Sequence, residues 1–315
     1  MEYNFDNLLN YLHGSKTVYF EPLWGNHGDY LIYLGAMKFF KLNNMTLVGS
    51  ISDADVVIIN GSGGMTSLWG AFPIIERYIE AGAKHIVVLP SSFHVPNECL
   101  RRLLTSASFH KCKLMLFARE RASLSRLSEV FSPDEEILLC HDMAFFLNED
   151  DIFQEVNFVR ANRNFILIVE RGDGEVKGID SAINTKKTAL RGIINSIPLK
   201  RYAPETIKKS ILRIEDRINL SNTKFARKIA NEYINRKAKI VTTDISSKRL
   251  YSFIEFVETV YSAKDVFTTR LHVSVLRNIF NKTCFLTPTG GEYRKNESIF
   301  ELSMRHRGYV KLLDM

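Results

Sequence analysis

Cysteine pairs and long apolar runs are both missing from this sequence. Its 315 residues include only four cysteines, Cys99, Cys112, Cys140 and Cys284, and no two of them form a Cys-x-x-Cys pair. This spacing argues against a zinc site and against a disulfide framework, and it favours a reducing cytoplasm. No apolar run approaches the roughly 18–20 residues that span a bilayer, and the acidic start MEYNFDNLLN is not typical of a signal peptide. We therefore expect a cytoplasmic protein without a transmembrane helix or a metal site.

Positive charge is concentrated in one part of the chain. The net charge is +7, yet residues 160–249 hold 21 Lys or Arg against 9 Asp or Glu, an excess of 12. Such a block could face an anionic membrane leaflet or an anionic glycan, or it could be a solvated helical surface without a partner. Peripheral contact with the inner face of a membrane therefore stays open. No RNA-binding or zinc-finger pattern is present, so nucleic acid is not expected as a partner.

Short apolar runs alternate with helical patterns in the first half of the chain. We expect strands at residues 16–20, 55–60, 85–90, 113–118 and 137–140. Helices are expected at residues 29–41, 73–81 and 121–131. Strands that alternate with helices predict βαβ units and a mostly parallel sheet.

The same pattern starts again after Leu147. Residues 148–163 are largely polar and are interpreted as a loop, which places a domain boundary near residue 150. Further strands are expected at residues 165–170, 239–243, 265–269 and 283–287, and helices at residues 250–262 and 273–280. Residues 178–235 are interpreted as mostly basic helix, and the tail from Glu297 as a helix that folds back over the domain interface. Two α/β domains, 1–150 and 151–315, predict a cleft in which ligands bind beyond the carboxyl ends of the strands.

Two glycine-rich turns follow strands of the first domain. Gly25-Asn26-His27-Gly28-Asp29 precedes a helix, where backbone N–H groups can approach an anion. Asn26 or Asp29 could equally be a plain helix cap. Residues 61–64 (GSGG) permit close approach of a ligand or a tight turn. Their spacing fits neither a Walker A loop nor a dinucleotide-binding fingerprint.

Charged residues follow three other expected strands. Arg119 is placed to grip a carboxylate or phosphate, or to pair with the adjacent Glu120. Arg270 and His272 lie two residues apart at a strand-to-helix turn, where the arginine can hold an anion and the histidine can act as a general acid. A histidine at a helix start can also be purely structural. Lys295, in a glycine-rich loop, could add positive charge to the cleft or be solvated.

Taken in order, these blocks resemble the polysaccharide pyruvyl transferase family, and most of all its exopolysaccharide members. The resemblance rests on GNHGDYLI (25–32), GSGG (61–64), ARERAS (118–123), TTRLHVSVLRN (268–278) and EYRKN (292–296). It implies a GT-B-like pair of Rossmann-like domains with the site in the cleft between them. It also implies transfer of pyruvate from phosphoenolpyruvate to a hexose as a cyclic ketal. The acceptor would be an exopolysaccharide or its lipid-linked precursor.

The resemblance also suggests roles for individual residues. Arg119 and Arg270 are associated with the donor and His272 with catalysis. We expect Lys295 and the backbone at Gly63 and Gly64 to assist donor binding, because phosphoenolpyruvate carries a phosphate and a carboxylate. His272 or Asp29 would deprotonate the hydroxyl. The predicted acceptor side is the first domain, with acceptor contacts from Asn26, His27, Asp29 and Tyr293, and the donor side is the second domain.

The expected partners are phosphoenolpyruvate as the donor substrate and a saccharide as the acceptor. No metal or other cofactor is predicted, because the enol phosphate itself drives the reaction and no ligand cluster suggests a metal. Two other functions remain open. One is a GT-B glycosyltransferase that uses a nucleotide sugar, since the same layout serves both activities. The other is a sugar- or membrane-binding protein built on an inactive transferase fold.

Overall fold

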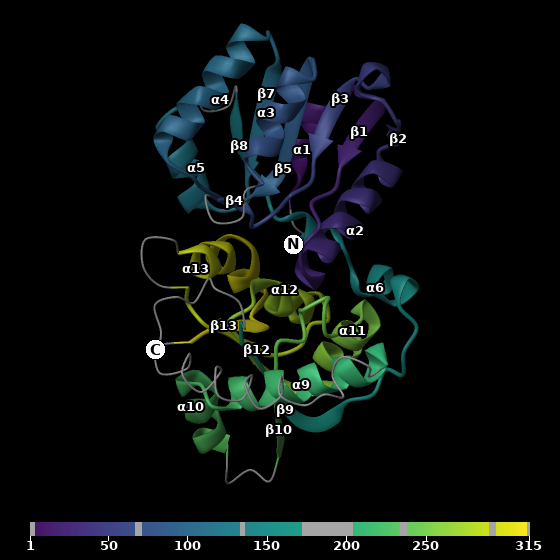
Figure 1. Ribbon diagram of the computed structural model, residues 1–315, viewed down its shortest axis with the longest axis vertical. Coiled ribbons are helices and arrows are strands. Elements are labelled where there is room, and N and C mark those ends of the chain that lie inside the picture. The colour runs from purple at the N-terminus through teal and green to yellow at the C-terminus, as the bar shows by residue number, and fades with distance from the viewer. Residues whose placement is uncertain are drawn as a thin grey trace.

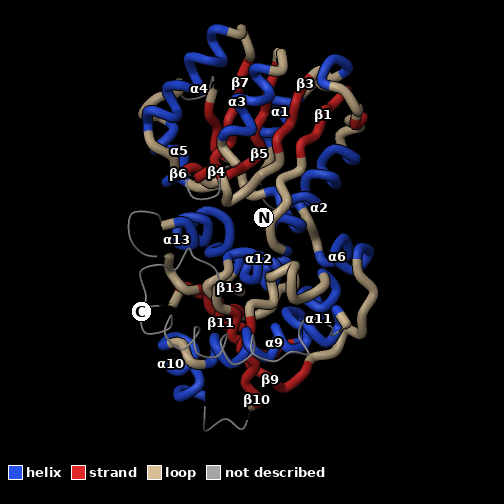
Figure 2. The backbone as a smooth tube through the Cα atoms, in the orientation of Figure 1, coloured by secondary structure: helices blue, strands red, loops and turns tan. Residues whose placement is uncertain are grey.

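The computed structural model describes residues 4–66, 71–132, 136–171, 204–233, 238–289 and 294–313. These residues form two α/β halves stacked along the long axis of the molecule (Figure 1). Figure 2 shows strands gathered in each half, with helices and loops between them. Each half is built on a parallel sheet, and a cavity lies between the halves. The prediction of a GT-B-like α/β fold with two Rossmann-like domains is thus confirmed.

The first sheet has six parallel strands in the order β2-β1-β3-β5-β7-β8. They are β1 (Thr17–Glu21), β2 (Thr46–Leu47), β3 (Val56–Ile59), β5 (His85–Ser91), β7 (Lys113–Ala118) and β8 (Ile137–Leu139). A separate parallel pair joins β4 (Met65–Thr66) and β6 (Phe93–His94). All four residues of β3 are buried, as expected for a strand covered on both faces.

Helices cover both faces of this sheet. α1 (Asp6–Leu12) and α2 (His27–Leu42) share a core with Ile58, whereas the neighbouring Ile59 packs with the opposite layer. That layer consists of α3 (Pro73–Glu80), α4 (Asn97–Phe109) and α5 (Arg121–Leu127). Successive residues of one strand thus face opposite layers, which leaves the strand ends as the place for polar groups.

The second sheet has five parallel strands in the order β10-β9-β11-β12-β13. They are β9 (Arg163–Val169), β10 (Lys239–Thr243), β11 (Ala263–Thr268), β12 (Cys284–Leu286) and β13 (Val310–Leu312). α11 (Phe253–Ser262) and α12 (Leu271–Ile279) pack on one face, and α10 (Lys224–Tyr233) packs on the other. α9 (Glu205–Ser221) precedes α10 and contacts β10.

One apolar core runs through both halves, from α1 and α2 to α11 and α12. α2 contacts both α12 and the 3₁₀ turn Met143–Phe146. Gly35 makes this packing feasible, because a Cβ at that position would lie 1.9 Å from the Met143 carbonyl oxygen. The starts of α2 and α12 are thereby brought together at the junction of the two halves.

Several predicted element bounds need correction. Residues 148–163 are not all loop, because α6 (Glu149–Glu155) begins there with a capping box between Asn148 and Asp151. The tail is helical in α13 (Lys295–Ile299) and on to Arg307, but it ends in β13, which extends the second sheet. α1 and α4 lie in stretches for which the sequence predicted no element. Part of the basic region, residues 178–203, lies outside the described residues.

Within the ranges that the structure describes, no helix is long and apolar enough to cross a membrane.

Candidate active site

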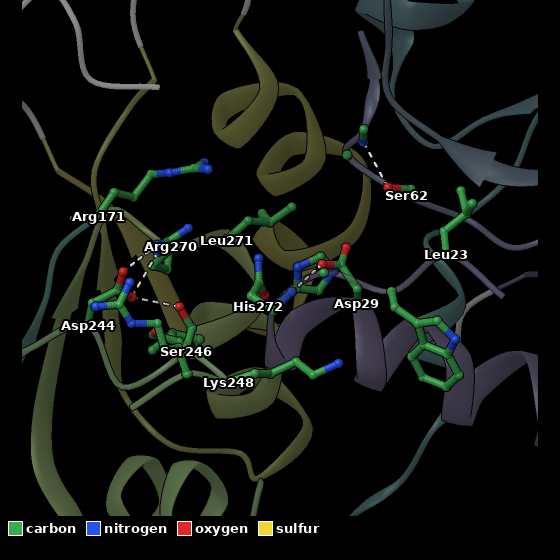
Figure 3. Close-up of a pocket in the computed structure, with 18 of the residues that line it drawn as sticks. Leu23, Asp29, Ser62, Arg171, Asp244, Ser246, Lys248, Arg270, Leu271 and His272 are labelled. Carbon is green, nitrogen blue, oxygen red and sulfur yellow. Dashed lines mark hydrogen bonds and ion pairs between the residues drawn. The ribbon is translucent and has the colours of Figure 1, made fainter. Parts of the chain in front are cut away.

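A cavity of about 1170 Å³ lies where the two halves meet. Loops that follow β1, β3, β7, β9, β10 and β11 line it, so it collects the carboxyl ends of strands from both sheets. Of the predicted site residues, the lining includes Asn26, Asp29, Gly63, Gly64, Arg119, Arg270, His272 and Lys295. Figure 3 shows how Arg270, His272 and Asp29 are arranged within it.

A buried carboxylate joins Arg119 to His272. Asp142 Oδ2 accepts a hydrogen bond from Arg119 Nη1 at 2.6 Å and lies 3.3 Å from His272 Nε2. Burial alone would raise the pKa of the Asp142 carboxyl, but His272 and Arg119 hold that pKa well below its usual range. An ionised carboxylate only accepts hydrogen bonds, so His272 Nε2 carries a proton in this contact. Asp142 therefore fixes the orientation of a histidine that belongs to the other half of the molecule.

His272 also packs tightly against the start of α2. A Cβ built on Gly28 would lie 2.5 Å from His272 Nδ1 and 2.6 Å from its Cγ. Glycine is thus needed at this position for the imidazole to occupy its place. The first glycine-rich turn contributes to the site by making room for a catalytic candidate.

Arg270 is held by a carboxylate of its own half. Its Nε donates to Asp244 Oδ1 at 3.0 Å, and its Nη2 donates to Asp244 Oδ2. Ser246 Oγ donates to Asp244 Oδ1 at 2.7 Å and steadies the same carboxylate. A bidentate pair sets the plane of the guanidinium, so Arg270 is pre-oriented toward the cavity.

Lys295 lies deep in the cavity among three arginines. Burial, together with the charges of Arg171, Arg119 and Arg270, lowers the pKa of its ammonium group to about 7, against the opposing influence of Glu120. A Cβ on Gly63 would lie 3.0 Å from Arg119 Nη2 and 3.6 Å from Lys295 Nζ. Gly63 is therefore in close contact with two of the predicted donor-binding cations.

Positive charge gathers around Lys295. Arg119, Arg171 and Arg270 line the cavity with it, and two of these arginines are paired, Arg119 with Asp142 and Arg270 with Asp244. The lining also includes four further acidic residues, Glu21, Asp29, Glu215 and Asp216. Burial raises the pKa of the nearby Glu120 carboxyl, which reduces its tendency to ionise. Such an arrangement suits a small ligand that carries several negative charges.

We predicted that the Gly64 backbone assists donor binding, but its N–H makes a hydrogen bond within the turn. Its N–H donates to Ser62 Oγ at 2.8 Å and so supports the turn itself. The site must therefore rely on side-chain cations rather than on this N–H.

The residues predicted to bind the acceptor are only partly brought together. Asn26 and Asp29 line the cavity, but they also cap α2: Asn26 Oδ1 accepts from Gly28 N, and Asp29 Oδ2 accepts from Asn26 N, both at 2.7 Å. His27 is buried, and its Nε2 donates to the Tyr251 carbonyl at 2.9 Å. It packs between the halves and does not line the cavity. Tyr293 lies outside the described residues.

Sequence reasoning missed three residues of the site, Asp142, Asp244 and Arg171. Each follows a strand at its carboxyl end, which is the signal that singled out Arg119. In the sequence, however, Asp142 is 130 residues away from His272 and Asp244 is 26 residues away from Arg270. Only the assembled fold brings these carboxylates to their partners.

No group of three or more His, Cys, Asp or Glu side chains in the described ranges is arranged to hold a metal ion. The expectation that the reaction needs no cofactor remains a prediction.

The fold and the site define a two-domain, GT-B-like α/β protein with a cationic cleft. The family model for polysaccharide pyruvyl transferase matches residues 10–282. The chain belongs to the polysaccharide pyruvyl transferase family, as its motifs predicted, and is a transferase of that family.

Two individual proteins illustrate the relationship. EpsO of Bacillus subtilis (strain 168), which bears the provisional name of a pyruvyl transferase, is 25% identical over 314 residues; the match spans 92% of this chain and 86% of that protein. A functionally uncharacterised protein from Klebsiella pneumoniae subsp. pneumoniae NTUH-K2044 has a similar crystal structure, with a TM-score of 0.62, 17% identity and coverage of 99% and 97% of the two chains. The structural similarity bears on the fold alone.

Proposed function

We propose that this enzyme transfers pyruvate from phosphoenolpyruvate to a pair of hydroxyls on a hexose, forming a cyclic ketal. The observation that carries the proposal is the cluster of Arg119, Arg171, Arg270 and Lys295 beside His272. Phosphoenolpyruvate has a phosphate and a carboxylate on a three-carbon skeleton, and both need fixed cations. The hexose belongs to an exopolysaccharide or to its lipid-linked precursor.

The proposed reaction begins with a proton transfer to the methylene carbon of the donor. This makes C2 electrophilic, and the first sugar hydroxyl adds there and loses its proton. The C2–O bond to phosphate then breaks, inorganic phosphate leaves, and the second hydroxyl closes the ring with loss of its proton. One of the two released protons balances the proton taken up by the methylene carbon, and the other goes to phosphate or solvent.

The chain's own residues have distinct parts in this scheme. The cations bind the donor and stabilise the departing phosphate, because fixed charges in a buried site need little reorganisation. His272 supplies the first proton, and Asp142 stabilises the imidazolium form and holds the ring in place. Asp29, at the start of α2, is the candidate base for the sugar hydroxyl, although its contact with Asn26 N also gives it a structural role.

Binding measurements test the donor assignment. Phosphoenolpyruvate should raise the melting temperature and bind in calorimetry, whereas a panel of nucleotide sugars should not. Arg119→Ala and Arg270→Ala should each weaken phosphoenolpyruvate binding, by about 10- to 100-fold for a charge-assisted contact. Unchanged affinity in both variants, or stabilisation by a nucleotide sugar alone, would contradict the donor assignment.

We also propose that α9 contacts an anionic membrane and so brings the site to a lipid-linked acceptor. Ile207, Ile214 and Ile218 are 50%, 57% and 44% exposed and lie on one stripe of this helix. Another side of α9 lines the cavity through Leu212 and Asp216. A helix that meets lipid with one face and the cavity with another suits an acceptor held at a membrane surface.

A further inference from the structure

Trp24 is a large aromatic side chain left exposed inside the cavity. It lies in the loop between β1 and α2, lines the cavity and is 57% exposed. An isolated apolar residue on an outer surface needs no explanation, but an indole exposed in a cavity next to a reactive cluster does.

The indole is held by residues from both halves of the molecule. Its ring centroid lies 5.0 Å from that of Tyr33 and 6.4 Å from that of Tyr30, both on α2. Lys248, in the loop after β10, places Nζ 5.2 Å from the Trp24 centroid. A ring supported in this way offers a preformed flat surface to a ligand.

The charge of the cavity lining differs between its two ends. In the view of Figure 3, Arg171, Arg270 and Asp244 lie at one end and Leu23 at the other, with His272 and Asp29 between them. The β1–α2 loop and the segment that leads into α3 contribute several apolar side chains to the lining, beside the polar Asn26 of the same loop. These apolar residues are Pro22, Leu23, Trp24, Ala71 and Ile74. The donor's charges fit the cationic end. The apolar end suits a neutral ligand with flat C–H faces.

Trp24 is also within reach of the reacting groups. The loop carries the chain from Trp24 to Gly28, which packs on His272, and then to Asp29. Four residues span at most roughly 14 Å even when fully extended. A sugar ring on the indole would therefore lie in the same part of the cavity as His272 and Asp29.

We propose that Trp24 is the stacking platform of the acceptor subsite, on which the pyranose ring of the acceptor hexose packs with its hydroxyl pair directed toward Asp29 and His272. This inference rests on the proposed transfer reaction and adds the position of the acceptor. Pyranose C–H groups pack well on an aromatic face, and an indole is the largest such face.

Tryptophan fluorescence can follow this contact directly. The chain has two tryptophans, Trp24 and Trp69, so a Trp69→Phe variant leaves Trp24 as the sole reporter. Titration with methyl glycosides of glucose, galactose, mannose and their N-acetylated forms should change the Trp24 emission for at least one hexoside. Uridine is the comparison ligand, because a nucleoside base also stacks on indole. Failure of every hexoside to change the emission, or a response to uridine alone, would overturn the platform.

Substitution supplies the kinetic arm of the test. Trp24→Ala should raise the KM for the responding hexoside about tenfold or more, the range expected for loss of one aromatic contact, and Trp24→Phe should recover part of the loss. The Kd for phosphoenolpyruvate should not change in either variant. Phe109→Ala, which removes another exposed aromatic on α4, is the matched control and should have no effect.

Two outcomes separate the Trp24 platform from the proposed transfer reaction. Transfer that proceeds with an unchanged acceptor KM in Trp24→Ala would overturn the platform and leave the proposed reaction intact. Hexoside-dependent fluorescence without any phosphate release from phosphoenolpyruvate would overturn the reaction and support the platform.

Discussion

At the scale of single residues, Asp142 connects the two parts of the site, because its carboxylate contacts both Arg119 and His272. Because it is fully buried, its charge depends on these partners and on the Ala144 N–H. It acts through His272 and is thus a positioning residue. Replacing it should disturb the chemical step more than donor binding.

Asp142→Asn should lower kcat by roughly 10²- to 10⁴-fold, the contribution typical of a general acid. Phosphoenolpyruvate affinity should be unchanged or tighter, because Arg119 loses its competing anion. Steady-state kinetics with calorimetry measures both quantities. Glu120→Gln is the matched control, since Glu120 is also buried and pairs with Arg119 at 3.7 Å; it should retain kcat within a few-fold. Equal losses in the two variants would indicate a structural role only.

Lys295 gives the site a pH dependence whose sign is fixed. With a pKa lowered to about 7, the Lys295 ammonium group of the unliganded enzyme loses its proton as the pH rises above 7. An anionic donor favours the protonated form, so phosphoenolpyruvate affinity should fall between pH 7 and 9, by at most about tenfold per pH unit for one proton.

Lys295→Arg should flatten this profile because arginine stays charged throughout the range. Calorimetry in two buffers of different ionisation enthalpy would reveal proton uptake on binding at pH 8 by the wild type. An identical pH profile in Lys295→Arg would exclude Lys295 as its source.

At the scale of secondary-structure elements, the start of α12 and the start of α2 work as one unit. Gly28 on α2 approaches the His272 side chain, whereas Gly35, two turns later, approaches the backbone at Met143. Substitution of Gly28 and of Gly35 by alanine should therefore have different consequences. A side chain can move aside, but a backbone carbonyl cannot move without shifting the core.

Gly28→Ala should lower kcat at least tenfold by displacing His272, with little change in unfolding free energy. Gly35→Ala should lower the unfolding free energy by about 1–3 kcal/mol, the usual cost of overpacking, and should leave the folded enzyme active. Gly49→Ala is the control, because nothing lies within 4 Å of a Cβ there. Denaturant unfolding and initial rates separate the effects, and normal activity in Gly28→Ala would contradict the placement of His272.

The bounds of the longer apolar strands could be predicted from the sequence, whereas α6 and β13 could not. β7 occupies residues 113–118 as expected, because a short apolar run between turns has few alternatives inside a parallel sheet. α6 was missed because five of its seven residues are polar or charged and its start depends on the capping pair Asn148 and Asp151. β13 has only three residues, and its strand character comes from pairing with β12.

The motif at residues 268–278 also contains an arginine, Arg277, which the sequence alone does not distinguish from a site residue. Arg277 lies in the same block as Arg270, but it is buried and donates to the backbone carbonyls of Val260, Ala263 and Thr283. It fastens the end of α12 to its neighbours and does not line the cavity. Motif reading identified Arg119, Arg270 and His272 as cavity residues, whereas their carboxylate partners depend on contacts between distant parts of the chain.

At the scale of the whole molecule, the two halves place a cationic pocket and an exposed aromatic loop at one junction, with α9 between cavity and surface. The exposed isoleucine stripe of α9, Ile207, Ile214 and Ile218, predicts binding to membranes. The protein should float with vesicles containing anionic lipid but not with neutral vesicles, and added salt should weaken binding.

Replacing all three stripe isoleucines with serine should abolish flotation. Ile254→Ser on α11 is the control, because Ile254 is 45% exposed on a different helix. Flotation that persists in the triple variant would remove α9 as the contact.

We propose that phosphoenolpyruvate supplies a pyruvyl group to a saccharide in the cavity between the halves. The most direct test is incubation of the enzyme with phosphoenolpyruvate and candidate glycans, with release of inorganic phosphate and the mass of the glycan followed together. We predict acceptor-dependent phosphate release matched by a pyruvyl ketal on the glycan, both lost in a folded His272→Ala variant. Phosphate release without a glycan adduct, or an adduct formed at a normal rate by His272→Ala, would contradict the account.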